Sequence, residues 1–298
     1  MQKPGYKLIA LDLDGTLLNS GGELSRENVR AMDRARESGM RVVICTGRGY
    51  KECKKYLDQM GQIDPVVVAG GSIIADAKSG QTVHRFTLDE VLVGGAVSKL
   101  LSHRLPALVL KDPSEVGYDY LVVHGQEKLG LDAVTEWWFK EMGVHARYVE
   151  DIATDEHPDH TVRFGVCGMS GILQTIQDDL QMSFGSATHI HHFPAVVAPQ
   201  HTSTTDDGQT LHVLEVFSKD GNKGTALKWV ADRMDVKLTE CAAVGDQIND
   251  LSMLTAVGLG IAMGNAVGRV KAASKTETHS NDMHGVSHAI ERILAKEW

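Results

Sequence analysis

The chain has 298 residues, 42% of them hydrophobic, and a formal net charge of −9 with histidine neutral. This length allows two domains or one large one, and the apolar share suffices for a core. The acidic balance, with no block rich in lysine and arginine, argues against a protein that binds nucleic acid or an anionic membrane. An anionic ligand would instead need a metal ion or a few well-placed hydrogen-bond donors.

The first third of the chain alternates strand-like and helix-like segments. We predict a strand at residues 7–13 and a helix at 25–38, with Ser25 as its N-cap. A β-branched strand that ends at Thr46, a helix to about Met60 and the strand of "PVVVAGGSIIAD" follow. Alternation at this spacing indicates a parallel α/β sheet.

The middle of the chain combines strand pairs with long helical patterns, which predicts an α+β unit. The strands include "TVRFGVCGM" and "THIHHF", and the polar segment 199–210 is typical of a linker or hairpin loop. The helical patterns lie at residues 89–102, 127–142 and 170–182.

The last ninety residues return to the α/β pattern, with an amphipathic helix in "NKGTALKWVADRM" and strands in "ECAAVGD" and "GLGIAMG". We therefore predict an α/β core domain built from both chain ends, residues 1–84 and 208–298. A second domain, residues 85–207, would be inserted between them.

Two aspartates, Asp12 and Asp14, follow the first apolar run in "DLDGT". Strand alternation would turn both toward the crevice at the carboxyl edge of the sheet, where α/β proteins bind ligands. Carboxylates at the end of a buried strand are costly unless a metal or donors compensate them. A plain Asp-Gly turn is the alternative.

A second acidic motif, "GDQIND", places Asp246 and Asp250 four residues apart, with Asn249 beside them. One helical turn would bring both carboxylates to the same side. The alternative is a polar loop with a helix cap.

Two further motifs carry donors. Lys223 opens the helix of "NKGTAL", where the macrodipole disfavours a cation unless an anion is bound there. Thr46 and Gly47 of "CTGR" end a strand, and their hydroxyl and backbone N–H groups would suit phosphate oxygens. A solvated surface lysine and a plain turn are the respective alternatives.

The four motifs all fall at strand ends or helix starts of the predicted core. Clustered oxygen ligands without cysteine or histidine favour a hard cation, Mg²⁺. A metal, a lysine and a carboxylate nucleophile are together the groups needed for phosphoryl transfer.

The ordered set "DLDGT", "CTGR", "NKG" and "GDQIND" resembles the motifs of the haloacid dehalogenase (HAD) superfamily, and "AMGNA" and "GVSHAIERIL" resemble its Cof-type phosphatases of subclass IIB. The resemblance implies a Rossmann-like parallel-sheet core with an inserted α+β cap domain. It departs at Gly70-Gly71-Ser72, where members often show Asn-Gly-Ala, a difference expected to alter substrate fit.

The resemblance also implies catalytic roles. Asp12 would attack phosphorus and form an aspartyl-phosphate, and Asp14 would protonate the leaving alcohol and then activate water. Thr46 and Lys223 would hold the phosphoryl oxygens.

The same resemblance implies a substrate side and a metal side for the site. Gly47 and Asn249 would lie on the substrate side. The implied Mg²⁺ ligands are Asp12, the backbone carbonyl of Asp14, and Asp246, with Asp250 in support.

We expect a cytoplasmic, Mg²⁺-dependent phosphatase of small phosphorylated metabolites such as sugar phosphates, with no nucleic-acid or membrane partner. Four cysteines without a Cys-x-x-Cys pair and the lack of a signal-peptide pattern favour the cytoplasm. A phosphomutase similar to phosphomannomutase, or a catalytically silent protein that binds a phosphorylated metabolite, are the alternatives.

Overall fold

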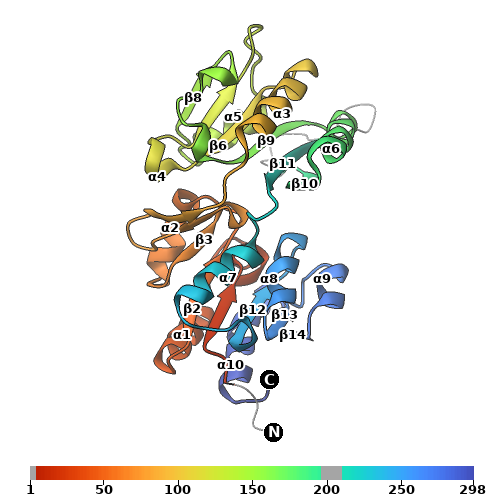
Figure 1. Cartoon of the computed structure of the whole chain (residues 1–298). Helices are drawn as coiled ribbons and strands as arrows, with labels where there is room; N and C mark the ends of the chain where they lie inside the picture. The colour runs from red at the N-terminus through yellow and green to blue at the C-terminus, as the bar shows by residue number, and fades with distance from the viewer. Residues whose placement is uncertain (1–4, 196–209) are drawn as a thin grey trace. The chain divides into compact units, whose positions relative to one another are not determined.

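The computed structural model describes residues 5–195 and 210–298. The chain forms two compact units, each with its own sheet (Figure 1). Unit 1 combines Met1–His84 with Asn222–Trp298, and unit 2 is Arg85–Gly221. The predicted fold class, an α/β core with an inserted second sheet, is confirmed.

Unit 1 is built on an eight-stranded sheet in the order β14-β13-β12-β1-β2-β3-β4-β5. It is parallel from β14 to β3, whereas β4 runs antiparallel to β3. The strands are β1 (Leu8–Leu11), β2 (Arg41–Cys45), β3 (Val66–Val68), β4 (Ile73–Ala75), β5 (Thr82–Arg85), β12 (Cys241–Gly245), β13 (Leu259–Ala262) and β14 (Thr276–Glu277).

The central strand β1 pairs with β12 on one side and β2 on the other, so Leu11 faces Val244 and Ile44. All four residues of β1 are buried, which explains a continuous apolar run instead of an alternating one. The helices that complete unit 1 are α1 (Arg26–Glu37), α2 (Tyr50–Gln59), α7 (Lys223–Arg233), α8 (Leu251–Ala256), α9 (Gly268–Ala273) and α10 (Gly285–Leu294).

The first strand is shorter than predicted. It ends at Leu11, and Leu13–Leu17 form an irregular turn in which Gly15 has a φ of 72°. The helix predicted at 25–38 is confirmed as α1, and the Ser25 hydroxyl accepts a hydrogen bond from the Asn28 N–H at 3.2 Å.

Unit 2 contains a six-stranded sheet in the order β10-β11-β9-β6-β7-β8, antiparallel except for the β7–β8 pair. Its strands are β6 (Ala107–Lys111), β7 (Tyr120–Val123), β8 (Ala146–Val149), β9 (Thr161–Met169), β10 (Thr188–Pro194) and β11 (Leu211–Ser218). Its helices are α3 (Glu90–Ser102), α4 (Pro113–Val116), α5 (Ala133–Glu141) and α6 (Ser170–Phe184).

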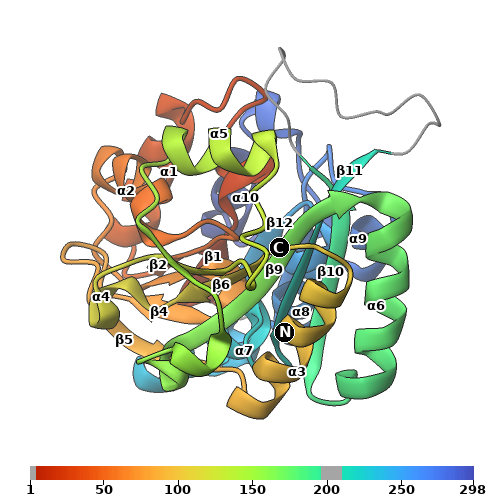
Figure 2. The same ribbon diagram turned by 90° about the horizontal axis from the view of Figure 1, so that it is seen from above.

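The core of unit 2 joins α3 and α6 to the strands, and α6 runs beside β10 and β11 (Figure 2). The predicted helix at 127–142 is wrong at its start: α5 begins after Asp132, whose side chain caps it. The predicted linker at 199–210 lies, up to residue 209, outside the described residues.

The second unit boundary also differs from the prediction. β11 pairs with β9 and β10, so the chain re-enters unit 1 at Asn222 rather than at residue 208. In the described parts of the chain, no helix has both the length and the hydropathy needed to cross a membrane.

Candidate active site

The site lies where β1 and β12 end. Asp12 follows β1 directly and donates its backbone N–H to the Val244 carbonyl at 3.1 Å, and Asp246 follows β12. Both side chains are buried, with 5% and 3% of the residue exposed. The carboxyl ends of two neighbouring parallel strands thus hold the two carboxylates together, at the edge where such sheets bind ligands.

Lys223 is the cation of this site. Its Nζ lies 2.6 Å from Asp12 Oδ1 and 2.6 Å from Asp250 Oδ1, and the side chain is fully buried. Burial alone would lower the lysine pKa, but the two carboxylates outweigh it and raise that pKa above its usual value. The alternative of a solvated surface lysine is therefore wrong.

Three carboxylates surround that one ammonium group. Asp12, Asp246 and Asp250 each offer an oxygen within 4.8 Å of the others. Burial, together with the neighbouring Asp250, raises the pKa of Asp12 well above its usual range and that of Asp246 to about 6. The excess negative charge and the all-oxygen donor set fit a hard divalent cation.

The carboxylate oxygens of the cluster differ in how many hydrogen bonds they already accept, and so in their capacity to bind a metal ion. Asp250 Oδ1 is held by Lys223, and Oδ2 accepts the backbone N–H groups of Asp246 and Gln247 at 2.9 and 3.0 Å. Asp246 Oδ1 accepts the Thr16 hydroxyl at 3.0 Å, and Oδ2 accepts only a longer hydrogen bond, from Gln247 Nε2 at 3.3 Å. Asp250 therefore orients Lys223 and the Asp246 backbone, whereas Asp12 and Asp246 are better placed to ligate.

The structure does not bring the Asp14 carboxylate into this cluster. The side chain is half exposed, and both its oxygens accept hydrogen bonds from Arg48, at 2.8 Å from Nε and 2.6 Å from Nη2. The expectation that strand alternation aligns Asp12 with Asp14 is wrong, because β1 ends at Leu11 and Asp14 lies in the following turn.

Arg48 is a site residue that the sequence reasoning left without a role, although it belongs to the quoted "CTGR" motif. Its guanidinium also lies over the Tyr56 ring, 5.4 Å from the centroid. The planar fork of an arginine matches a carboxylate bidentately. The presence of Arg48 in the same motif as Thr46 could have marked it as a site residue. Its partner Asp14 lies 34 residues earlier in the sequence, so the contact itself was not predictable from the motif.

The other predicted substrate-side residues lie around the same strand ends. Thr46 is buried, and its hydroxyl accepts the Arg48 N–H at 3.1 Å. A Cβ on Gly47 would be 3.8 Å from Asn249 Nδ2, so these two residues are neighbours. The buried Asn249 Oδ1 has no hydrogen-bond partner among the described residues.

The Gly70-Gly71-Ser72 segment packs against the start of α7. Gly71 has a φ of 109°, and a Cβ there would be 2.1 Å from the Asn222 carbonyl carbon. Only glycine fits this close approach. Ser72 is buried with its hydroxyl unpartnered among the described residues. It lies two positions after Gly70, where the resemblance would place an asparagine.

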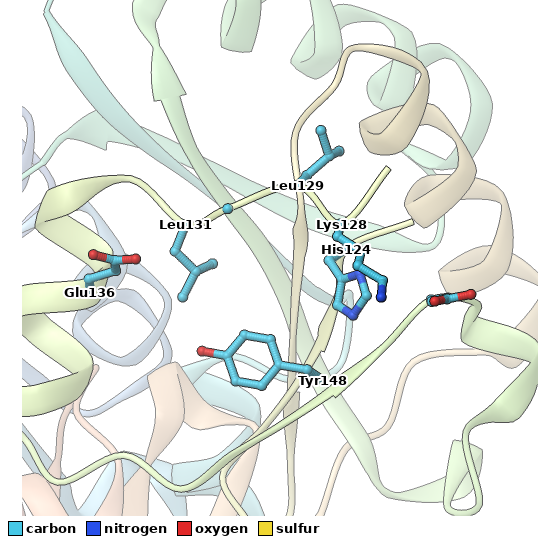
Figure 3. A pocket seen from close by; sticks show the side chains of 8 residues that line it. His124, Lys128, Leu129, Leu131, Glu136 and Tyr148 are labelled. Atoms are coloured by element: carbon cyan, nitrogen blue, oxygen red, sulfur yellow. The ribbon is translucent and has the colours of Figure 1, made fainter. Parts of the chain in front are cut away.

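Unit 2 contains a separate pocket of about 480 Å³ (Figure 3). Tyr148 lies between Leu131 and Glu136 on one side and His124 and Lys128 on the other. The lining carries two carboxylates, including Glu150, against one ammonium group. Among the described residues, the carboxylates that could hold a metal ion are those around Lys223 and not these two, so a cation would offset negative charge for a phosphate there but not in this pocket.

Comparison with known proteins gives one family. A model of haloacid dehalogenase-like hydrolases matches residues 9–290. Phosphatase YwpJ of Bacillus subtilis (strain 168) is 29% identical over 97% of this chain and 100% of its own length. The 5-amino-6-(5-phospho-D-ribitylamino)uracil phosphatase YwtE of the same organism is 29% identical over 98% of this chain and 99% of its own.

The fold comparison agrees. A crystal structure of a haloacid dehalogenase-like hydrolase from Bacteroides thetaiotaomicron superposes with a TM-score of 0.74 at 26% identity. It covers 97% of this chain and 99% of that one. The similarity thus spans both units and includes the insertion.

Proposed function

Because the chain belongs to the haloacid dehalogenase-like hydrolases, we propose that it is a Mg²⁺-dependent phosphatase of small phosphorylated metabolites. One observation carries the proposal: Lys223 bridges Asp12 and Asp250 at 2.6 Å each, beside Asp246. A buried carboxylate that is held by a lysine and adjoins a cation site has the groups that an attack on phosphorus needs.

Asp12 is the nucleophile in this proposal. Lys223 holds Oδ1, so the other carboxylate oxygen attacks phosphorus while the bond from phosphorus to the ester oxygen breaks. Lys223 favours the ionised form of Asp12, against the burial that raises its pKa. Mg²⁺, held by Asp12 and Asp246, would neutralise charge on the phosphoryl oxygens.

Asp14 is the proton-transfer residue. The departing alkoxide takes a proton from the Asp14 carboxyl, which then accepts a proton from the water that hydrolyses the aspartyl-phosphate. Inorganic phosphate leaves, and Asp12 is regenerated. Both Asp14 oxygens accept hydrogen bonds from Arg48, so Arg48 must release Asp14 before its carboxyl can reach the leaving group.

We further propose that Thr46, Gly47 and Asn249 contact the phosphoryl group and that unit 2 selects the substrate. The name of the relative YwtE describes a phosphorylated ribityl compound. We extend only the chemical class to this chain, which is a phosphomonoester on a small polyhydroxylated metabolite.

The test is release of inorganic phosphate from a panel of phosphorylated metabolites, with Mg²⁺ and with EDTA. We expect Mg²⁺-dependent release that needs no second sugar phosphate, and a loss of at least about a thousandfold in kcat for Asp12→Asn. Asp33→Asn, a change to an exposed carboxylate on α1, is the control. Near-normal turnover by Asp12→Asn contradicts the mechanism, and turnover only with added sugar bisphosphate indicates a mutase.

A further inference from the structure

The turn that carries Asp14 is irregular, although the Leu18 N–H closes it by donating to the Leu13 carbonyl at 2.9 Å. Within Leu13–Leu17, Asp14 has a ψ of 127° and Gly15 a φ of 72°, so the segment lacks regular helical geometry. A glycine in such a turn is free to change its peptide planes. The Asp14 backbone carbonyl, which the family resemblance implies as a metal ligand, belongs to this segment, so contacts from elsewhere in the fold help to set its orientation.

Three asparagine side chains provide hydrogen bonds to this turn. Each donates its Nδ2 to a backbone carbonyl that the turn leaves available. The bonds run from Asn265 to Gly15 (2.8 Å), from Asn28 to Leu17 (3.1 Å) and from Asn281 to Leu18 (3.0 Å). We call these three residues the asparagine cradle.

Two members of the cradle are buried and belong to packed elements. Asn28 is fully buried in α1, and its Oδ1 also accepts the Ser287 N–H at 3.0 Å. Asn281 is 8% exposed. Replacement of either would disturb the packing of unit 1, so the effect of the hydrogen bond could not be separated from that of folding.

Asn265 is different because it is exposed and uses both ends of its amide. Nδ2 donates to the Gly15 carbonyl, and Oδ1 accepts the Asn281 N–H at 2.9 Å. It therefore ties the centre of the turn to the segment that bears Asn281.

Gly15 is the point where the turn meets the carboxylate cluster. A Cβ on Gly15 would lie 2.5 Å from Asp246 Oδ2, so its backbone is in close approach to that carboxylate. The next residue, Thr16, donates its hydroxyl to Asp246 Oδ1 at 3.0 Å. Fixing the Gly15 carbonyl therefore also fixes the side of the turn that orients Asp246.

We propose that Asn265 is a positioning residue of the metal site: through the Gly15 carbonyl it holds the Asp14 peptide and the Thr16–Asp246 contact in the geometry that a cation requires. This inference rests on the metal site of the proposed function. Loss of a residue that orients metal ligands costs about 10–100-fold in metal affinity or activity.

The experiment compares Asn265→Ala and Asn265→Asp with the wild-type chain. The aspartate keeps an acceptor for the Asn281 N–H but cannot donate to Gly15, so it isolates the Gly15 bond. Asn19→Ala is the matched control, because Asn19 accepts the Glu23 N–H at 2.9 Å outside the turn. The first readout is the Mg²⁺ concentration that half-saturates the rise in Tm, without substrate. The second is the Mg²⁺ dependence of phosphate release.

We expect both Asn265 variants to need about 10–100-fold more Mg²⁺ in each assay, while Asn19→Ala matches wild type. If the Asn265 variants have a lower Tm but need the same Mg²⁺ concentration as wild type, the role of Asn265 is merely structural and the proposal is overturned. A wild-type Tm that does not rise with Mg²⁺ would overturn it as well. If the Tm assay separates the variants but wild type releases no phosphate from any substrate, the inference stands and the proposed phosphatase function fails.

Discussion

At the scale of single residues, the charge balance of the site depends on Lys223. This ammonium is fully buried and contacts two carboxylates of the three in the cluster. Its removal leaves buried negative charges without a partner. The free-energy penalty of such unpaired charges is much larger than the net stabilisation from an intact buried ion pair.

We therefore expect Lys223→Met to abolish phosphate release and to lower the free energy of unfolding by about 3–5 kcal/mol near neutral pH. The loss should shrink as pH falls, because the unpaired carboxylates then bind protons and lose their charge. Chemical denaturation at two pH values measures both effects.

Lys228→Met supplies the comparison on the same helix. Lys228 pairs with Asp232 on the surface, where both side chains are more than half exposed, so the change should cost less than about 1 kcal/mol. Equal losses for the two variants would contradict the account of Lys223.

The same residues show what could be predicted from sequence. That Asp12, Asp246 and Lys223 lie together follows from motifs at strand ends and a helix start, since those positions converge in a parallel sheet. The place of Asp14 could not be predicted, because it depends on Arg48, whose side chain reaches it across 34 residues of sequence. The roles of all these residues remain proposals.

At the scale of elements, Lys223 is placed by the contact between Gly71 and the start of α7. The Gly71 Cα approaches the Asn222 backbone so closely that no side chain fits, and its φ of 109° is unfavourable for other residues. The N-cap Asn222 accepts the Thr225 N–H at 3.0 Å and fixes the first turn of that helix.

Gly71→Ala should therefore push the start of α7 away and lower stability by at least about 2 kcal/mol, with a loss of activity larger than the loss of folded protein. Gly94→Ala is the control, because a Cβ there meets nothing within 4 Å. Gly94 lies inside α3, so its replacement should stabilise by about 0.5–1 kcal/mol. Thermal unfolding should show a lower Tm for Gly71→Ala and a higher Tm for Gly94→Ala. Changes of Tm in the same direction would refute the argument.

Elements were predictable where the signal is local. The capped helix α1 and the strand β9, whose bounds Thr161–Met169 coincide with "TVRFGVCGM", depend on residues within a few positions. The predicted boundary at residue 208 would place Leu211–Ser218, where no strand was predicted, in the core domain, whereas β11 pairs with β9 and β10 of unit 2. Strand pairing is a long-range property.

At the scale of the whole molecule, the carboxylate cluster links the stability of the fold to pH and to metal. The pKa of Asp246 is raised from an ordinary value near 3.8 to about 6. The folded, metal-free protein thus holds this proton more tightly than the unfolded chain does. Stability from this group is lost as pH rises through about 6.

Mg²⁺ should remove that cost, so its effect on Tm depends on pH. Above pH 6 the ion binds an ionised site, whereas near pH 5 it must displace protons. We expect Mg²⁺ to raise Tm more at a pH of about 7.5 than at about 5.5. When Mg²⁺ exceeds its Kd a hundredfold, its binding stabilises the folded protein by about 2.7 kcal/mol. Scanning calorimetry with NaCl as the ionic-strength control measures the shift. A rise that does not change with pH, or that persists in Asp246→Asn, would count against the assignment.

The division of unit 1 between the two chain ends also has a consequence for synthesis. β1 has β2 on one side, but its other neighbour begins at Cys241, after the whole of unit 2 has been made. Ribosomes add about 5–20 residues per second, so the open edge of the nascent β1 would persist for roughly 10–45 s. Open strand edges recruit other strands. A cell that makes this chain must therefore keep its first strand from pairing elsewhere until about the last fifth of the chain emerges.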